Sequence, residues 1–197
     1  MDWQALIGAG ALCYLLGSVP FSYLIARFKN IDIRQHGSGN VGATNVTRVV
    51  GVGYGALALI GDMGKGVAAA WFTSIVNVPL WLSSLAVVGH NWSIWLKFRG
   101  GKGVATTLGL LLFFSWPALL VTVGIWVVTV LLTRYVAVGS MMALVLIPGV
   151  LYLFGTRNFE LIGLFGVLGL LTVWQHRSNI QRISQGTEGQ IFKKRAE

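Results

Sequence analysis

The sequence predicts an all-α integral membrane protein that crosses the bilayer seven times, with its N-terminus outside and its C-terminus in the cytoplasm. Of its 197 residues 55% are apolar and 11% charged, whereas soluble domains carry about 25% charged residues. Apolar stretches long enough to enter a bilayer recur from one end of the chain to the other. The cations concentrate in alternate connecting segments, which is the asymmetry that orients membrane proteins.

The apolar stretches mark the expected helices, some of them short. In chain order they are residues 3–26, 52–76, 79–96, 104–115, 117–133, 135–154 and 158–175. The first cations, Arg27 and Lys29, come after the first stretch, which is the reverse of a secretory signal, so we expect this helix to remain uncleaved. We also expect residues 1–197 to form a single polytopic domain, because no stretch of soluble character interrupts the pattern.

The stretch from Val104 to Thr133 fits either one long helix or two short ones. Its 30 residues exceed the roughly 20 that a spanning helix needs. Proline within Ser115-Trp116-Pro117 removes a backbone donor and would interrupt a single helix.

The cations favour two helices there. With seven crossings, thirteen cations fall in cytoplasmic segments and only Arg157 in an outer loop, while Lys65 lies within the second stretch. A single helix over 104–133 would place the basic C-terminal residues outside, against the positive-inside rule. The thirteen are Arg27, Lys29, Arg34, Arg48, Lys97, Arg99, Lys102, Arg134, Arg177, Arg182, Lys193, Lys194 and Arg195.

This topology brings three polar segments, residues 36–48, 89–103 and 176–188, to the cytoplasmic face. They are rich in glycine, asparagine and cations, and Glu188 is their only acid. They also contain every histidine of the chain, namely His36, His90 and His176. We therefore expect one site for anionic substrates, assembled from three loops.

The middle segment is typical of an anion site. Arg99-Gly-Gly-Lys-Gly103 leads directly into an apolar helix, whose unpaired N–H groups and positive dipole end would face the loop. Glycines let backbone amides approach a phosphate, and a lysine adds charge; the alternative is a flexible loop with cations reaching the lipid headgroups. The candidate residues are Gly100, Gly101, Lys102 and Gly103. The loop is not a Walker A motif, since it lacks the required Ser/Thr after the lysine.

The first segment repeats this chemistry. Glycines free its backbone, neutral side chains offer hydrogen bonds, and an arginine provides a fork suited to phosphate. Helix N-capping alone would explain only one or two of these residues. The candidates are Ser38, Gly39, Asn40, Thr44, Asn45 and Arg48.

Two further pairs have helical spacing. His176 and Asn179 share a face if the last helix continues beyond residue 175. Asp62 and Lys65 lie within an apolar stretch, where charges are costly, so we predict a structural ion pair.

Four stretches together resemble a known family. GSGNVGATNVTR, GHNWSIWLKFRGGKGVATTLG and HRSNIQR followed by Glu188 are similar to the three signature motifs of the bacterial acyl-phosphate:glycerol-3-phosphate acyltransferases, the PlsY family. GDMGKG resembles that family's Asp-x-x-Lys-Gly element. The resemblance covers nearly the whole chain, in order and with matching spacing. It implies an inner-membrane enzyme that transfers an acyl group from a long-chain acyl phosphate to glycerol 3-phosphate, giving lysophosphatidic acid and phosphate in phospholipid synthesis.

The resemblance also implies residue roles. Ser38, Arg48, His176 and Asn179 match residues important for activity, the Gly100–Gly103 loop matches the glycerol-phosphate-binding loop, and Glu188 matches a residue linked to structural integrity. We expect Lys102 to act with the first four. Ser140, in a Tyr-Val-x-x-Gly-Ser pattern similar to the family's, is a further substrate-binding candidate.

The sequence leaves two candidates for the base that deprotonates the glycerol hydroxyl. The His-x-x-x-x-Asp pair of many thioester-using acyltransferases is absent, because Val41, Trp95 and Gln181 occupy that offset after the three histidines. An acyl phosphate is already activated, so either His176 or a phosphate oxygen of the donor takes the proton. A nucleophilic Ser38 is less favoured, since no base neighbours it in the sequence.

Competing classes are an organic-anion transporter, a lipid phosphatase and a membrane scaffold. The chain has neither an evident internal repeat nor a phosphatase signature, and a scaffold leaves three polar loops unexplained. Without an HExxH motif, and with six acids in all, no metal or cofactor is expected. The expected partners are the two substrates and membrane lipid, with no nucleic acid and no obligatory protein partner.

Overall fold

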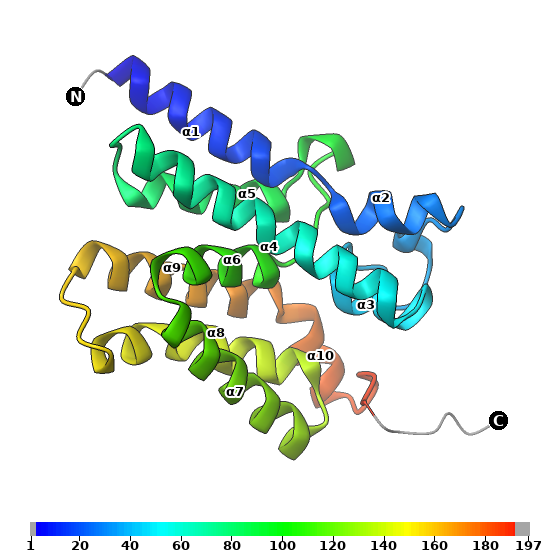
Figure 1. The fold of residues 1–197 in the computed structure, drawn as a ribbon. Coiled ribbons are helices and arrows are strands. Elements are labelled where there is room, and N and C mark those ends of the chain that lie inside the picture. Colours follow the sequence, from blue (N-terminus) through cyan, green and yellow to red (C-terminus); the bar gives the residue numbers. More distant parts are fainter. Residues whose placement is uncertain (1–2, 192–197) are drawn as a thin grey trace. The chain divides into compact units, whose positions relative to one another are not determined.

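The computed structural model describes residues 3–191, and every regular element within that range is a helix (Figure 1). The predicted all-α class is confirmed. The chain divides into two compact units, Met1–Phe114 and Ser115–Glu197. The tail cations Lys193, Lys194 and Arg195, on which part of the topology prediction depends, lie outside the described residues.

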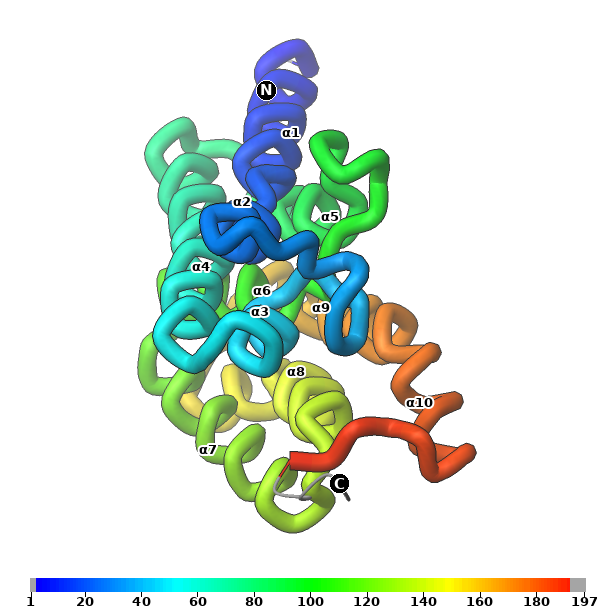
Figure 2. Tube along the Cα trace, turned by 90° about the vertical axis from the view of Figure 1, so that its right-hand side faces the viewer, coloured from blue at the N-terminus to red at the C-terminus, as the bar shows by residue number. Residues whose placement is uncertain are grey.

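The first unit is built around one long helix, α4, against which α1, α2, α3, α5 and α6 all pack (Figure 1, Figure 2). Its elements are α1 (Trp3–Ser18), α2 (Phe21–Phe28), η1 (Ile33–Gln35), α3 (Ala43–Val49), α4 (Val52–Ile75), η2 (Leu80–Ser84), α5 (Leu85–Asn91), η3 (Ile94–Leu96) and α6 (Val104–Phe114). The second unit packs α7 (Trp116–Thr133) against α8, and α8 against α9. Its other elements are α8 (Val136–Leu153), α9 (Phe159–Gln175) and α10 (Arg177–Ser184).

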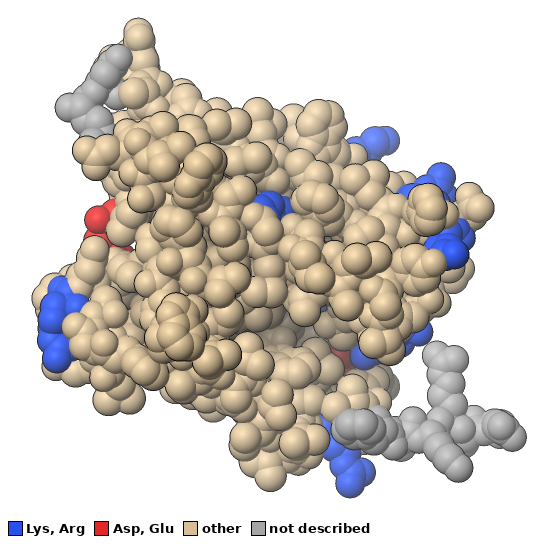
Figure 3. All heavy atoms as spheres, viewed as in Figure 1, with Lys and Arg blue, Asp and Glu red and all other residues tan. Residues whose placement is uncertain are grey.

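Several helices suit a bilayer. Three segments in the described range are long and apolar enough to cross one, namely Trp3–Phe28, Trp116–Thr133 and Val136–Leu153, and the bent pair of α9 and α10 makes up to a fourth. Little of the surface visible in Figure 3 is charged. Leu131, Val128 and Leu170 are more than half exposed, and such extensive apolar exposure fits contact with lipid.

Three predicted boundaries can be compared directly with the structure. The stretch 104–133 does break into two helices, because Ser115 caps α7 by accepting a hydrogen bond from the Ala118 amide. The expected helix 3–26 is instead interrupted between Ser18 and Phe21, where Pro20 lacks a backbone donor.

The expected helix 79–96 is not regular. It consists of η2, the seven-residue α5 and η3. The hydroxyls of Ser83 and Ser84 donate to the carbonyls of Leu80 and Trp81, local bonds that compete with a regular helix. This segment and the 11-residue α6 are each shorter than a spanning helix of about 20 residues.

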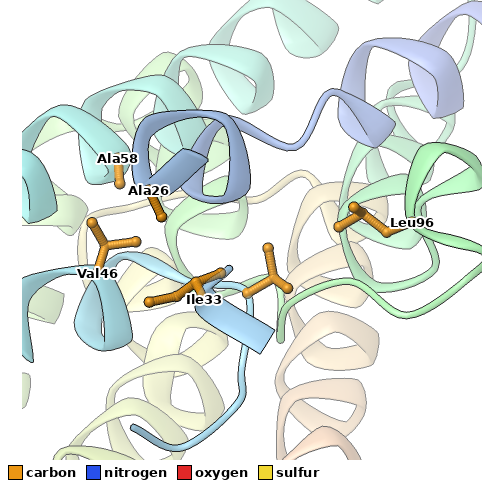
Figure 4. Close-up of a cluster of buried hydrophobic side chains, with 6 residues drawn as sticks. Ala26, Ile33, Val46, Ala58 and Leu96 are labelled. Atoms are coloured by element: carbon orange, nitrogen blue, oxygen red, sulfur yellow. The ribbon is translucent and has the colours of Figure 1, made fainter. Parts of the chain in front are cut away.

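An apolar cluster fixes the first polar segment to the rest of its unit (Figure 4). Ile33 and Val46, both fully buried, pack with Ala26 of α2 and Ala58 of α4. Val41 and Leu96 complete the cluster. The segment that precedes α3 therefore shares one core with α4 and with η3.

α1 and α5 approach each other at backbone distance. An added Cβ at Gly17 would overlap the Ala86 carbonyl oxygen, and one at Gly89 would overlap the Tyr14 carbonyl oxygen. This reciprocal contact allows the short helix α5 to lie directly on α1.

Gly17→Ala should therefore destabilise the protein. The obstructing atoms are backbone, so the helices must separate, at about 1–3 kcal/mol. At about 2–4 °C per kcal/mol for a chain of this size, a thermal melt in detergent should show a clear fall in Tm. Gly8→Ala on the same helix is the control, because an added Cβ there meets no atom within 4 Å. Equal Tm values for the two variants would contradict the close packing.

Candidate functional site

The first polar segment is folded around the side chain of Asn45, which is 2% exposed. Its Nδ2 lies 3.2 Å from the Ile33 carbonyl oxygen, 3.0 Å from that of His36 and 3.1 Å from that of Asn40. Its Oδ1 accepts a 3.0 Å hydrogen bond from the Ser38 amide. These partners are backbone groups of the segment itself and of η1 just before it, so Asn45, which the sequence suggested as a substrate ligand, shapes the loop.

The other candidates of this segment lie on its surface. Ser38, Thr44 and Arg48 are exposed, and Thr44 and Arg48 are one helical turn apart on α3. Gly39, with φ of 70°, follows Ser38 in a conformation that favours glycine, and the half-buried Asn40 comes next. The Ser38 amide is bonded to Asn45 of α3, the same helix that carries Thr44 and Arg48, so the loop with Ser38 is fixed to that helix.

Arg34, near this loop, has its charge matched locally. Asp32 accepts hydrogen bonds from Arg34 Nε at 2.9 Å and from a terminal guanidinium nitrogen at 2.7 Å. These bonds lower the pKa of Asp32 to about 2, which keeps it ionised at neutral pH. The His36 ring bonds the Asp32 carbonyl oxygen through Nδ1 at 2.9 Å, which ties the loop to η1.

In the second polar segment the chain reverses direction at Lys97 and Phe98, so that Gly100 and Gly101 lie against the end of α5. We call this part of the chain the Gly100–Gly101 turn. The Gly100 amide donates to the Asn91 carbonyl oxygen and the Gly101 amide to that of His90, each at 3.0 Å. These two donors, expected from the sequence to face a phosphate, are therefore used within the turn. Lys102, half-buried, follows directly, and α6 begins after Gly103.

A buried polar group lies beside this turn. Lys65 Nζ lies 3.0 Å from Asp62 Oδ1, which confirms the predicted ion pair, and donates to the Val19 carbonyl oxygen at 3.0 Å. Ser22 Oγ donates to Asp62 Oδ2 at 2.7 Å, and His90 Nδ1 lies 3.5 Å from Asp62 Oδ1. We call Ser22, Asp62, Lys65 and His90 the Asp62 cluster.

The Asp62 cluster lines a small cavity together with Gly100 and Gly101, with room for about one water molecule. Sequence reasoning missed Ser22 and His90 as partners of Asp62, because they come from other helices. The signal available for His90 was its place in a polar segment where all three histidines concentrate.

In the second unit, His176 lies at the junction of α9 and α10, where the two axes bend by 49°. Its Nδ1 lies 2.8 Å from the Thr172 carbonyl oxygen. A carbonyl can only accept, so Nδ1 carries the proton, and a neutral ring then has its lone pair on Nε2. His176 and Asn179 are 4% and 6% exposed, consistent with the shared face expected from their spacing.

Glu188 braces this region. It accepts hydrogen bonds from Asn179 Nδ2 at 2.8 Å and from Arg182 Nε at 2.6 Å. Ser140, on α8, is also buried; its hydroxyl donates to the Val136 carbonyl oxygen at 2.9 Å and accepts from Trp126 Nε1 at 3.3 Å.

The fold and these residues define an integral membrane protein. It has a glycine-rich loop with a lysine at the start of α6, and a buried histidine, His176, whose Nδ1 carries the proton. Such features suit an enzyme for anionic substrates. The comparisons with known proteins identify the family. The glycerol-3-phosphate acyltransferase family profile matches residues 7–186. The glycerol-3-phosphate acyltransferase of Gloeobacter violaceus is 43% identical over 201 residues, covering 97% of both chains. That of Desulforudis audaxviator is 44% identical over 196 residues, covering 97% of this chain and 98% of the relative.

Solved structures agree. The crystal structure of PlsY, an integral membrane glycerol 3-phosphate acyltransferase, in its glycerol 3-phosphate form matches with a TM-score of 0.87. It is 34% identical, over 95% of this chain and 96% of that one. The lysophosphatidic acid form matches with a TM-score of 0.85. The chain belongs to the glycerol-3-phosphate acyltransferase family, and it is a membrane acyltransferase.

Asn45→Ala should unfold the first polar segment locally. It removes the acceptor of the Ser38 amide and a donor to the Asn40 carbonyl, which costs about 1–3 kcal/mol, while the Ile33 and His36 carbonyls keep a backbone donor each. Thermal melts should show a lower Tm, and hydrogen exchange at Ser38 should accelerate. Thr44→Ala, at the exposed neighbouring position, is the control and should change neither. A slow-exchanging Ser38 amide in Asn45→Ala would show that the loop does not depend on this side chain.

Proposed function

We propose that the chain transfers a fatty acyl group from acyl phosphate to glycerol 3-phosphate, giving 1-acyl-glycerol 3-phosphate and phosphate. This would be the first acylation of bacterial phospholipid synthesis. One observation carries the proposal: the chain matches, over nearly its whole length, a structure known in glycerol 3-phosphate and lysophosphatidic acid forms. The acyl phosphate donor is supported by the similarity of the sequence motifs to enzymes that use it.

We place the enzyme in the bacterial inner membrane, with seven crossings, an outer N-terminus and a cytoplasmic site. The cation distribution supports this topology. In it, α4, the segment from η2 to η3, and α6 supply the crossings beyond the four apolar segments. We also propose that residues 1–197 act as one acyltransferase domain without an obligatory protein partner, because the family profile runs across the boundary between the two units.

We assign phosphate recognition to two cationic side chains, Lys102 and Arg48, and to the polar groups near them. Lys102, Gly103 and the first turn of α6 offer a charge and N–H groups at a helix start. Arg48, with Thr44 one turn before it, offers a second phosphate contact on the exposed face of α3, and Ser38 is held on the same helix through Asn45. Gly100 and Gly101 contribute by shape, since their amides are already bonded. Gly39, Asn40 and Asn45 hold Ser38 in place, and Ser140 contributes to binding from α8.

In the reaction the glycerol oxygen attacks the acyl carbonyl carbon, the bond from that carbon to the phosphate oxygen breaks, and phosphate leaves. Lys102 and Arg48 stabilise the charge that develops on the carbonyl oxygen and the departing phosphate. The hydroxyl proton goes either to Nε2 of His176 or to a phosphate oxygen of the donor. Asn179, held by Glu188, positions the substrate in both cases.

A phosphate-release assay on the purified protein tests the proposal. Palmitoyl phosphate should release phosphate and yield lysophosphatidic acid only when glycerol 3-phosphate is present, and palmitoyl-CoA should give no product. Product from the thioester would overturn the donor assignment. Absence of product with both donors, from protein that melts cooperatively, would overturn the proposed function and direct attention to anion uptake into liposomes.

His176→Ala separates the two routes for the proton. Loss of a general base should lower kcat about 10²–10⁴-fold at saturating substrates. Proton transfer to the donor phosphate should instead leave kcat within about tenfold of the wild type and raise KM for glycerol 3-phosphate. Ser178→Ala, an exposed position between His176 and Asn179, is the control for local disturbance of α10. A wild-type profile in His176→Ala would remove this residue from the site altogether.

A further inference from the structure

The Asp62 cluster is larger than a structural ion pair requires. Lys65 already neutralises Asp62 on the same helix, and Ser22 supplies a hydrogen bond. His90 is a third partner, brought from α5 and 7% exposed. Charged and polar groups inside a membrane segment are costly, so a role for the imidazole beyond charge balance is worth seeking.

His90 contacts the Gly100–Gly101 turn in two ways. Its carbonyl oxygen accepts the Gly101 amide, while the Asn91 carbonyl oxygen accepts that of Gly100. The second contact is made by the His90 side chain. A Cβ added to Gly101 would overlap His90 Nε2, so the ring lies directly against the turn. The same added Cβ would also overlap the Val41 carbonyl oxygen. Gly101 is therefore enclosed between α5 and the first polar segment.

The helix after the turn is fixed on the same support. An added Cβ at Gly66 would overlap the Thr106 carbonyl oxygen, and one at Gly109 would overlap that of Met63, so α4 and α6 are in backbone contact. α4 therefore carries both the body of α6 and, through Asp62, the ring of His90. In the sequence, Lys102 and the start of α6 lie between Gly101, which contacts His90, and Thr106, which contacts α4.

We propose that His90 is a positioning residue for glycerol 3-phosphate. Asp62 orients its ring, the ring and carbonyl hold the Gly100–Gly101 turn, and the turn sets the position of Lys102 and of the first N–H groups of α6. The proposal rests on the proposed function. It assigns His90 to binding of glycerol 3-phosphate, the acyl acceptor, whereas binding of the acyl donor should not depend on it.

Two substitutions test the roles of the two ring nitrogens of His90 separately. In His90→Asn an amide nitrogen replaces Nδ1, which keeps a donor toward Asp62 but leaves the Gly101 side empty. In His90→Gln an amide nitrogen reaches the Nε2 position and still supports the turn. Thr73→Val on α4 is the matched control, since Thr73 is fully buried and donates to the Ala70 carbonyl oxygen within its own helix.

Full-length variants are assayed in detergent with palmitoyl phosphate, and glycerol 3-phosphate is also tested without donor for its effect on Tm. His90→Asn should raise KM for glycerol 3-phosphate about 10- to 100-fold and reduce the Tm increase at a fixed ligand concentration. Its KM for the donor should stay within about twofold, and its kcat should fall by less than about tenfold, because Lys102 also acts in the transfer step. His90→Gln should recover much of the affinity, and Thr73→Val should show wild-type kinetics.

An unchanged KM for glycerol 3-phosphate in His90→Asn would overturn the proposal. So would a lower Tm and a lower kcat together with an equal rise in both KM values, because that pattern marks a purely structural residue. If His90 variants do not fold, Ser22→Ala weakens the hold on Asp62 while keeping every charge; it must raise the same KM, and a wild-type value would also overturn the proposal.

Failure of the proposed function is recognised separately in the wild type. There it appears as absent acyl transfer, whereas the thermal shift still reports whether glycerol 3-phosphate binds and whether His90 matters for it. A wild-type protein with neither acyl transfer nor a thermal shift from glycerol 3-phosphate would overturn both.

Discussion

Burial of the Asp62 carboxylate inside α4 obliges several parts of the first unit to supply partners for it, because an unpaired ion in a low-dielectric interior costs several kcal/mol. Lys65 comes from the next turn, Ser22 from α2 and His90 from α5. Lys65 extends the connection to the Val19 carbonyl oxygen at the break between α1 and α2. The positions of three helices and one helix break thus meet at a single carboxylate.

Close helix contacts make this convergence possible. Gly17 and Gly89 let α5 lie on α1, and Gly66 and Gly109 let α6 lie on α4, in each case with backbone against backbone. In lipid, where the hydrophobic effect does not drive helices together, such contacts supply packing energy. They also explain why an α5 of only seven residues holds a defined position.

The features that sequence reasoning predicted are those set by local spacing. The Asp62–Lys65 pair follows from helical spacing, and the break of the stretch 104–133 at Ser115 follows from capping. The rest depends on tertiary structure. The identity of Asp62's other partners required the packing of α2 and α5, and the irregular course of 79–96 arose from serine side-chain bonds that compete with helix formation.

The candidate site divides in the same way. Which residue types cluster in the polar segments could be predicted, but not which of them face outward. Asn45 carries the same chemistry as a substrate ligand, yet its amide is directed at the loop's own backbone. The amides of Gly100 and Gly101 are likewise used by the end of α5, a pairing that no local pattern encodes.

The loop around Asn45 has a consequence for how the enzyme can change. Its scaffold and its outward side chains are distinct sets: a buried amide keeps the shape, while Ser38, Thr44 and Arg48 present chemistry to the surroundings. A preassembled loop has little conformational entropy left to lose when a ligand arrives. Substitutions in the outward set should therefore change the chemistry offered to a ligand while the architecture beneath it stays intact.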